Sequence, residues 1–588
     1  MKKTIIYIML AAVSLAAVSC EGFLDRYPYD TTSAAVAFGS AIKAEAAVAG
    51  MYSNLSYDYS SVTPVNWDSY AGILDPSAAS GLSGDDILLT GKIQPNNSLF
   101  LTWWKRLYEG INRANDVIEH IDAVPDMTPA LKACRKAEAK FIRAYHYYRL
   151  NCLWRGVPVY LKNLGTDQYT KGRSSEEEVW NTIITDLNAC IACESFPDKY
   201  ASGDANFGRA TKGAAYMLRG KVYMWKKEWA SAESDFLKVT TMGYSLPSGL
   251  SYADLFLLKN EKSDEMIFSW GAENVSGYGN VFSRTYGNWD TAGNGNNTYY
   301  VNTDFVDSYE CSDGKPFNWD DFLPGYSGMS EKARSVYFLR DGLTAAEKAA
   351  MSAYGADMTK YLDTGNEDRI KAAYAGRDPR LQATVITPYS EYTGGFYGEA
   401  LPYVFRFPYR SDETGIGNDL RTRRSDRMFY CPRKFVAVGR ECTDVTFNPT
   451  DVPIFRYADL LLLLAEAINE QEGRTADAIP YVNQVRTRAG VAALGSNSYT
   501  AVSGQDDLRA RIRNEKRWEL ALEEVLFTEE LRWETWEGFR FRPGAGLKEL
   551  WGTNVTTYEF GGSHYYRWPI PSSEAEKNTN LKQNPDWI

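Results

Sequence analysis

The chain has 588 residues, of which 44% are apolar and 24% are charged, and its formal net charge is −11. This composition is typical of a globular protein and excludes a disordered, collagen-like or disulfide-scaffold chain. The 14% aromatic share, from 40 Tyr, 25 Phe and 16 Trp, exceeds what a core supplied with Leu, Ile and Val requires. We therefore expect part of the aromatic side chains to line a surface or a pocket.

The N-terminus is predicted to be a secretory signal. Lys2 and Lys3 precede an apolar run from Ile5 to Val18, which is too short to span a membrane. Small residues up to Ser19 stand directly before Cys20, as at the processing site of a bacterial lipoprotein. We expect removal of residues 1–19 and acylation of Cys20, and each buried acyl methylene then adds about 0.8 kcal/mol of membrane affinity. The alternative is an ordinary signal peptide that is cut near Ser19.

The charge of the mature chain limits its partners. Residues 1–19 hold two Lys and no acidic residue, so their removal changes the formal charge from −11 to −13. An acidic body argues against nucleic acid as a partner, and it also disfavours polyanionic ligands.

Helical periodicity dominates both ends of the chain. In 101–121 the apolar residues Trp104, Leu107 and Ile111 recur at three- and four-residue spacing, which predicts one apolar helix face. Similar patterns predict helices over about 132–154, 176–193, 209–226, 229–241, 457–471, 475–489 and 505–526. The fold class is therefore predicted to be mostly α, with helices in pairs and long loop-rich insertions.

One helix pair matches a known repeat. The tetratricopeptide spacing is met by Tyr216, Gly220, Tyr223, Ala232, Phe236 and Val239. The small residues Gly220 and Ala232 would allow the two helices to approach closely, with the aromatic residues filling the groove. A second pair over 457–489 has Glu466 where the repeat has Gly, so we predict a degenerate repeat there.

Two stretches are predicted to be long loops. From Trp270 to Tyr326, 13 of 57 residues are aromatic, eight are Gly and eight are Asn, with almost no helical periodicity. A shorter stretch of the same kind covers about 52–99. Because long loops on a rigid frame commonly carry binding residues, we expect a ligand site there.

We find no motif for catalysis, a cofactor or a metal. The sequence lacks HExxH, G-x-S-x-G, P-loop, G-x-G-x-x-G and EF-hand patterns, and it has only three His. Cys190 and Cys193 form a CxxC inside a predicted helix, and we interpret them as packing residues rather than a zinc or redox site. The acid pairs Asp85-Asp86, Asp320-Asp321 and Glu523-Glu524 are expected to be surface, turn or cap residues.

Short motifs in a fixed order resemble a known family. They include Tyr108-Glu109-Gly110-Ile111-Asn112-Arg113-Ala114-Asn115, Gly208-Arg209-Ala210-Thr211, Asp378-Pro379-Arg380, Phe455-Arg456-Tyr457-Ala458-Asp459, Val485-Arg486-Thr487-Arg488 and Glu515-Lys516-Arg517-Trp518-Glu519. The chain resembles the SusD/RagB-like outer-membrane lipoproteins of Bacteroidota over nearly its whole length. It departs from the family pattern after Ala521, in the stretch from Glu523 to Trp533.

The resemblance implies a tetratricopeptide-like scaffold, a surface lipid anchor, and a partner in a SusC-like TonB-dependent transporter. The expected organisation is a signal peptide (1–19), a lipid-anchored tether (20–40), an N-terminal helical region (41–250) with a ligand loop (52–99), a loop-rich ligand-binding insertion (251–450) and a C-terminal helical region (451–588). The motif arginines Arg143, Arg209, Arg456 and Arg517 are expected to pair with acids between helices.

The resemblance also implies that loops in these two regions bind the ligand. A sugar ring offers an apolar face and a rim of hydroxyl groups, so aromatic rings beside Asn and Asp suit it. The predicted ligand residues are Asn66, Trp67, Asp68, Tyr70, Tyr278, Tyr286, Asn288 and Trp289. We expect a glycan-binding protein that uses no cofactor or metal and is not an enzyme. A peptide-binding member of the family and a surface glycosidase are the alternatives.

Overall fold

The structure is a computed structural model that describes residues 34–58, 66–77, 82, 84–410, 418–423 and 428–587. The predicted signal peptide and Cys20 lie outside these residues. Within the described ranges, no helix combines the length and the apolar character that crossing a membrane requires.

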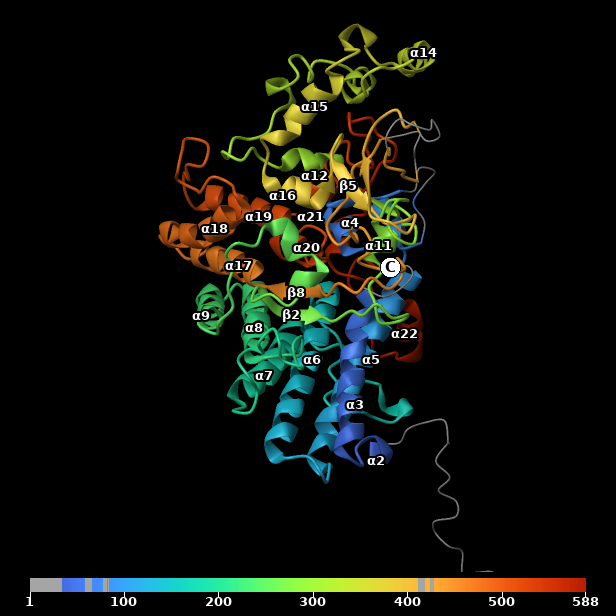
Figure 1. The fold of residues 1–588 in the computed structure, drawn as a ribbon. Coiled ribbons are helices and arrows are strands. Elements are labelled where there is room, and N and C mark those ends of the chain that lie inside the picture. Colours follow the sequence, from blue (N-terminus) through green and yellow to red (C-terminus); the bar gives the residue numbers. More distant parts are fainter. Residues whose placement is uncertain are drawn as a thin grey trace, which may run out of the picture.

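Helices from the two ends of the chain form one array (Figure 1). Its members are α3 (Ala41–Tyr52), α5 (Ser98–His120), α6 (Pro129–Trp154), α7 (Glu176–Ala192), α8 (Lys212–Lys226), α9 (Trp229–Thr240), α17 (Tyr457–Asn469), α18 (Thr475–Ala489) and α19 (Gln505–Leu520). Helices α5 to α9 pack in sequence order, and α9 then packs against α17, which contacts α18 and α19. The prediction of a mostly α fold built from helix pairs is confirmed.

Local sequence signals set the beginnings of these helices. The Ser175 hydroxyl accepts from the Glu178 backbone N–H, and the Glu178 carboxylate accepts from the Ser175 N–H, so α7 starts with a capping box. The Thr128 hydroxyl caps α6, whose first residue is Pro129.

The α8–α9 pair shows the predicted close approach. A Cβ atom on Gly220 would lie 2.4 Å from the Phe236 ring, so only glycine fits at this crossing. Phe236 fills the groove and is fully buried. Tyr216 and Tyr223 do not fill it, because they are half-buried and flank the Arg219 guanidinium at 5.3 and 6.0 Å.

The helix predicted over 505–526 ends at Leu520 instead. Leu522 and Glu524 have φ values of 68° and 63°, and left-handed residues interrupt a right-handed helix. The chain then begins α20 (Leu526–Trp533). This break lies in the stretch where the sequence departs from the family pattern.

A two-stranded antiparallel sheet closes the base of the loop-rich insertion. Strand β2 (Met266–Trp270) pairs with β8 (Val452–Arg456), so residues 271–451 leave and re-enter the helical array at one place (Figure 1). The longer helices of the insertion, α14 (Ala345–Tyr354) and α15 (Asn366–Ala375), lie at the far end of the molecule from α3 (Figure 1).

The remaining elements are short. The strands are β1 (Leu74–Pro76), β3 (Tyr299–Val301), β4 (Val385–Ile386), β5 (Glu391–Gly394), β6 (Leu401–Val404) and β7 (Cys431–Pro432). The helices are α2 (Ala34–Ala37), α4 (Trp67–Ala71), α10 (Tyr252–Leu255), α11 (Phe282–Thr285), α12 (Thr303–Ser308), α13 (Glu331–Arg334), α16 (Pro379–Thr384), α21 (Trp536–Arg540) and α22 (Ser572–Lys577).

The two predicted ligand loops contact each other. Strand β1 from the first loop pairs antiparallel with β3 from the second, with Leu74 opposite Val301. Most aromatic residues of the second loop are buried in the core, including Phe282, Tyr286, Tyr300, Phe305, Tyr309 and Tyr326. The aromatic excess there thus builds a core between short elements that have few aliphatic side chains to pack.

Candidate functional site

The eight predicted ligand residues fall into a buried and an exposed set. The side chains of Asn66, Trp67, Asp68, Tyr70, Tyr286 and Asn288 are all buried. Tyr278 and Trp289 are 67% and 39% exposed. A sugar needs an open aromatic face, and the buried rings of Trp67, Tyr70 and Tyr286 offer none in this structure, so a ligand role for the six buried residues stays a prediction.

Several of the buried residues join three distant segments. The Asn66 amide Nδ2 donates to the Tyr286 hydroxyl at 2.7 Å, and that hydroxyl donates to the Glu524 carboxylate at 2.5 Å. The Trp67 backbone N–H donates to the other Glu524 oxygen at 2.5 Å. Glu524 therefore holds the two predicted ligand loops against the C-terminal region.

The side chains beside this junction complete the packing. The Trp67 ring lies 5.6 Å from the Trp568 ring and 5.8 Å from Phe527, which also contacts Tyr70 at 5.5 Å. The Asp68 carboxylate accepts a 3.0 Å bond from the Glu524 N–H. Burial raises the pKa of Asp68 to about 7.

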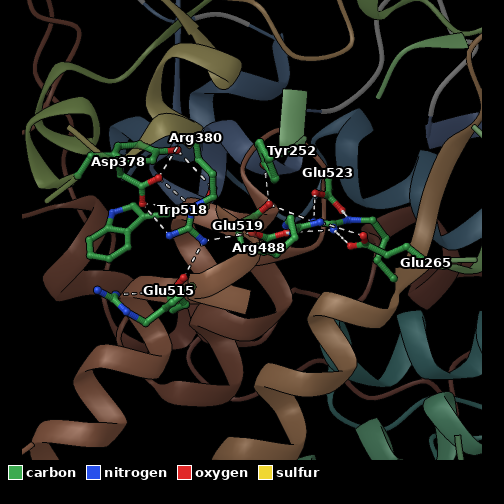
Figure 2. Close-up of polar contacts among 12 residues, drawn as sticks. Tyr252, Glu265, Asp378, Arg380, Arg488, Glu515, Trp518, Glu519 and Glu523 are labelled. Atoms are coloured by element: carbon green, nitrogen blue, oxygen red, sulfur yellow. Dashed lines mark hydrogen bonds and ion pairs between the residues drawn. The ribbon is translucent and has the colours of Figure 1, made fainter. Parts of the chain in front are cut away.

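The charged family motifs meet in a second buried group (Figure 2), which we name the charged cluster. Its members are Glu265, Asp378, Arg380, Arg456, Arg488, Glu515, Glu519 and Glu523. Arg456 is 1% exposed, and its guanidinium lies 2.6 Å from Glu523 and 3.0 Å from Glu519. It lies at the end of β8, directly before α17.

The charges of this cluster compensate one another. Burial by itself would raise the pKa of Glu519, but the guanidinium groups of Arg488, Arg456 and Arg380 lower it to about 2. Arg380 in turn lies 2.6 Å from both Asp378 and Glu515. With its charges paired and buried, the cluster is a structural joint rather than a ligand site.

Ion pairs confirm the structural role predicted for the four motif arginines. Besides Arg456, the pairs are Arg143–Asp186 at 2.7 Å, Arg209–Glu138 at 3.0 Å and Arg517–Glu530 at 2.7 Å. Of the surface, turn or cap positions expected for Glu523 and Glu524, the structure shows the turn: both lie between α19 and α20, buried and bonded and not at the surface.

Exposed aromatic side chains gather at the β5–β6 hairpin. Phe396 and Tyr397, at its tip, are 38% and 61% exposed, and their ring centroids lie 5.0 Å apart. The Arg421 guanidinium lies 4.8 Å from the Phe396 ring and 5.0 Å from the Tyr397 ring. Trp289 adjoins them, because its backbone N–H donates to the Arg421 carbonyl at 3.0 Å. We name Trp289, Phe396 and Tyr397 the aromatic platform.

Asp290 holds the three segments of the platform together. Its backbone carbonyl accepts from the N–H groups of Gly395 and Phe396 at 2.9 and 3.1 Å. Its fully buried carboxylate accepts from the Arg421 backbone N–H and Nε, both at 2.7 Å. Burial raises the pKa of Asp290, although the bonds from Arg421 oppose that rise. The platform is thus positioned before any ligand arrives.

Glycine makes this close approach feasible. A Cβ on Gly394 would lie 2.4 Å from the Asp290 carbonyl oxygen, and one on Gly395 would lie 1.9 Å from the Gly439 carbonyl oxygen. Replacing Gly394 and Gly395 by larger residues would therefore push the hairpin tip away from the segment that carries Trp289.

Tyr278, the other exposed residue of the predicted set, stands on a separate loop. Its N–H donates to the Val275 carbonyl, and the neighbouring Asn274 side chain accepts from the Thr443 hydroxyl at 3.0 Å. The structure therefore brings only Trp289 of the predicted residues to the platform.

Sequence reasoning missed Phe396, Tyr397 and Arg421. The signal that identifies the hairpin tip is local: two adjacent aromatic residues flanked by Gly395 and Gly398. A search for long aromatic-rich stretches does not detect such a short pattern.

The platform offers stacking faces and hydrogen-bond donors but little for proton transfer. Its nearest buried acid, Asp290, is occupied by Arg421. Within the described ranges, no group of three or more His, Cys, Asp and Glu residues could hold a metal ion. Cys190 and Cys193 are free thiols, and the buried Cys190 contacts the Ala137 carbonyl oxygen.

Comparisons with known proteins agree with this architecture. The model of the SusD family matches residues 264–587, and a model described as "Starch-binding associating with outer membrane" matches residues 22–224. The SusD-like protein P25 of Formosa agariphila is 24% identical over 99% of this chain and 97% of its own length. The starch-binding protein SusD of Bacteroides thetaiotaomicron is 24% identical over 79% of this chain and 75% of its own length.

A solved structure shows the same fold. A SusD-like carbohydrate-binding protein of Bacteroides fragilis superposes with a TM-score of 0.69 at 21% identity, covering 93% of this chain and 99% of its own. Since the SusD model alone spans more than half of the chain, the chain belongs to the SusD family of Bacteroidota.

Proposed function

We propose that this protein is a cell-surface glycan-binding lipoprotein that captures oligosaccharides on the aromatic platform and passes them to a SusC-like TonB-dependent transporter. The observation that carries the proposal is the exposed, pre-positioned group of Trp289, Phe396 and Tyr397 around Arg421. Aromatic rings stack on the apolar face of a sugar, and a guanidinium donates to its hydroxyl groups.

Family relatives support the choice of ligand class. The name of the Bacteroides thetaiotaomicron relative describes it as starch-binding, and that of the Bacteroides fragilis structure as carbohydrate-binding. The family description "associating with outer membrane" supports the location. The lipid on Cys20 and the transporter partner are parts of the proposal that rest on the sequence and the family resemblance.

Binding to a panel of soluble oligosaccharides tests the ligand class. Titration calorimetry should find at least one glycan that binds, and Trp289→Ala should weaken it at least tenfold, or about 1.4 kcal/mol. Tyr499→Ala is a matched control, because Tyr499 is 46% exposed on the loop between α18 and α19. Binding that Trp289→Ala leaves intact would contradict the site.

The same samples separate the alternatives. A rise in melting temperature with peptide mixtures and not with glycans would favour the peptide-binding member of the family. Release of reducing ends by the purified protein would show a glycosidase. We expect neither result.

The anchor and the partner need separate experiments. Replacing Cys20 by Ala should abolish labelling with a fatty acid and release the protein from cells. Solubilised native membranes should yield a transporter barrel together with the lipoprotein, and its consistent absence would contradict the delivery step.

A further inference from the structure

Unpaired arginines border the aromatic platform. Arg423 and Arg440 are exposed, and Arg284 is half-buried on α11. In the part of the chain that the structure describes, no carboxylate lies within ion-pair distance of any of these three guanidinium groups. Most other arginines of this acidic chain have such partners, as those of the charged cluster show.

Backbone contacts place these arginines on two sides of the platform. Arg440 donates to the Gly398 carbonyl at the hairpin tip, one residue beyond Tyr397. Arg423 follows Arg421 by two residues and has an exposed side chain, whereas the intervening Thr422 is buried.

Arg284 lies near Arg423. The Arg284 carbonyl accepts from the Asn296 N–H at 2.8 Å, and the Arg423 N–H donates to the Asn297 side chain at 3.4 Å. Both arginines therefore flank one turn of the loop that carries Trp289.

Among the residues that the structure describes, the acids nearby only partly offset this charge. Asp290 neutralises Arg421, and Asp419 is shared by Arg406 and Arg410 at 2.8 and 3.4 Å. Glu441 accepts from the Val438 N–H, at the turn that precedes Arg440. Glu399, at the hairpin tip, is exposed and opposes the arginines.

Local charge decides what binds here. At physiological ionic strength the screening length is about 8 Å, so the net charge of −11 over the whole chain acts weakly at the platform. The planar guanidinium group presents parallel N–H donors that can bind two oxygens of a carboxylate or sulfate at once. The acidic body alone disfavoured polyanions, but the arrangement of these arginines reverses that expectation for this one surface.

Building on the proposed function, we infer that the oligosaccharide is anionic. Its rings stack on Trp289 and Tyr397, while its carboxylate or sulfate groups pair with Arg423 and Arg440, and with Arg284 on the side of Trp289. Sugars with either anionic group share this chemistry.

Matched pairs of glycans test the inference. We would titrate the full protein with oligogalacturonides and with carrageenan oligosaccharides, each beside its carboxyl-reduced or desulfated counterpart. The anionic member of at least one pair should bind at least tenfold more tightly than its neutral counterpart. The ratio of the two affinities should decrease as NaCl is raised from 50 to 300 mM, because salt screens the charges. The pair that shows the preference identifies the anionic group.

Charge variants locate the effect. Arg423→Gln or Arg440→Gln should each weaken binding of the anionic glycan at least threefold and leave a neutral glycan unchanged, whereas Glu399→Gln should strengthen anionic binding. Lys238→Gln is the control, since Lys238 is exposed on α9, which lies on the other side of the molecule from β5 (Figure 1).

The outcomes distinguish the inference from the proposed function. If neutral glycans bind as tightly as anionic ones and Trp289→Ala weakens both, the proposed function stands and the anionic ligand is refuted. If the arginine variants change nothing, the inference is likewise overturned. If no glycan shows binding that depends on Trp289, both proposals fall.

Discussion

Replacing Glu519 by Gln removes one charge from the charged cluster while keeping the size and shape of the side chain. Glu519 is fully buried, so solvent does not screen its interactions. Its pKa lies at about 2 instead of the ordinary 4.5 because Arg488, Arg456 and Arg380 outweigh the effect of burial. At 1.36 kcal/mol per pKa unit, the ionised carboxylate contributes about 3 kcal/mol to the stability at pH 7. Breaking a buried ion pair typically costs a similar amount, about 3–5 kcal/mol.

The pH dependence gives the sign of this effect. Because the folded-state pKa is depressed, the contribution is complete above the unfolded pKa of about 4.5 and is lost as the pH falls toward 2. The difference in unfolding free energy between the native protein and Glu519→Gln should therefore be about 3 kcal/mol at pH 7 and less than half of that at pH 3.

Urea unfolding followed by tryptophan fluorescence measures this difference. Glu576→Gln is the control, since Glu576 is exposed on α22, and it should change the unfolding free energy by less than about 0.5 kcal/mol. A Glu519→Gln variant as stable as the native protein at pH 7, or one whose deficit is the same at pH 3, would refute the reasoning.

Three further variants test the packing and the positioning of the platform. Gly220→Ala should cost about 1–3 kcal/mol because the new Cβ meets the Phe236 ring, whereas Gly50→Ala, with no atom within 4 Å, should be neutral or slightly stabilising in thermal unfolding. Tyr286→Phe should lower stability by about 1–3 kcal/mol and leave glycan affinity unchanged; reduced affinity in a fully folded variant would restore this residue to the ligand site. Asp290→Asn should weaken glycan binding severalfold with a native circular dichroism spectrum, and unchanged affinity would contradict its positioning role.

The helical scaffold could be predicted from the sequence because its signals are local. Apolar spacing located α5 to α9 and α17 and α18 within a few residues, and the Gly220 crossing followed from repeat spacing. The end of α19 could not be predicted, because left-handed residues such as Glu524 are held by bonds to residues such as Asp68, more than 400 positions away.

The ligand site was harder to predict for the same reason. Trp67 and Trp289 both sit among Asn and Asp in loop-like sequence, yet one is buried and the other exposed. Trp67 is covered by Phe527, whereas Trp289 bonds to Arg421 through its backbone and keeps its side chain exposed, and local composition encodes neither contact. Composition singled out the loop that carries Trp289, and the fold shows which of its aromatic side chains are exposed.

The structure of the protein in complex with its tightest-binding glycan tests the central claim most directly. The account predicts that sugar rings lie in van der Waals contact, within about 4 Å, of the Trp289 indole and the Tyr397 ring, with Arg421 donating to the glycan. A glycan bound elsewhere, with Trp289 and Tyr397 left exposed to solvent, would contradict it.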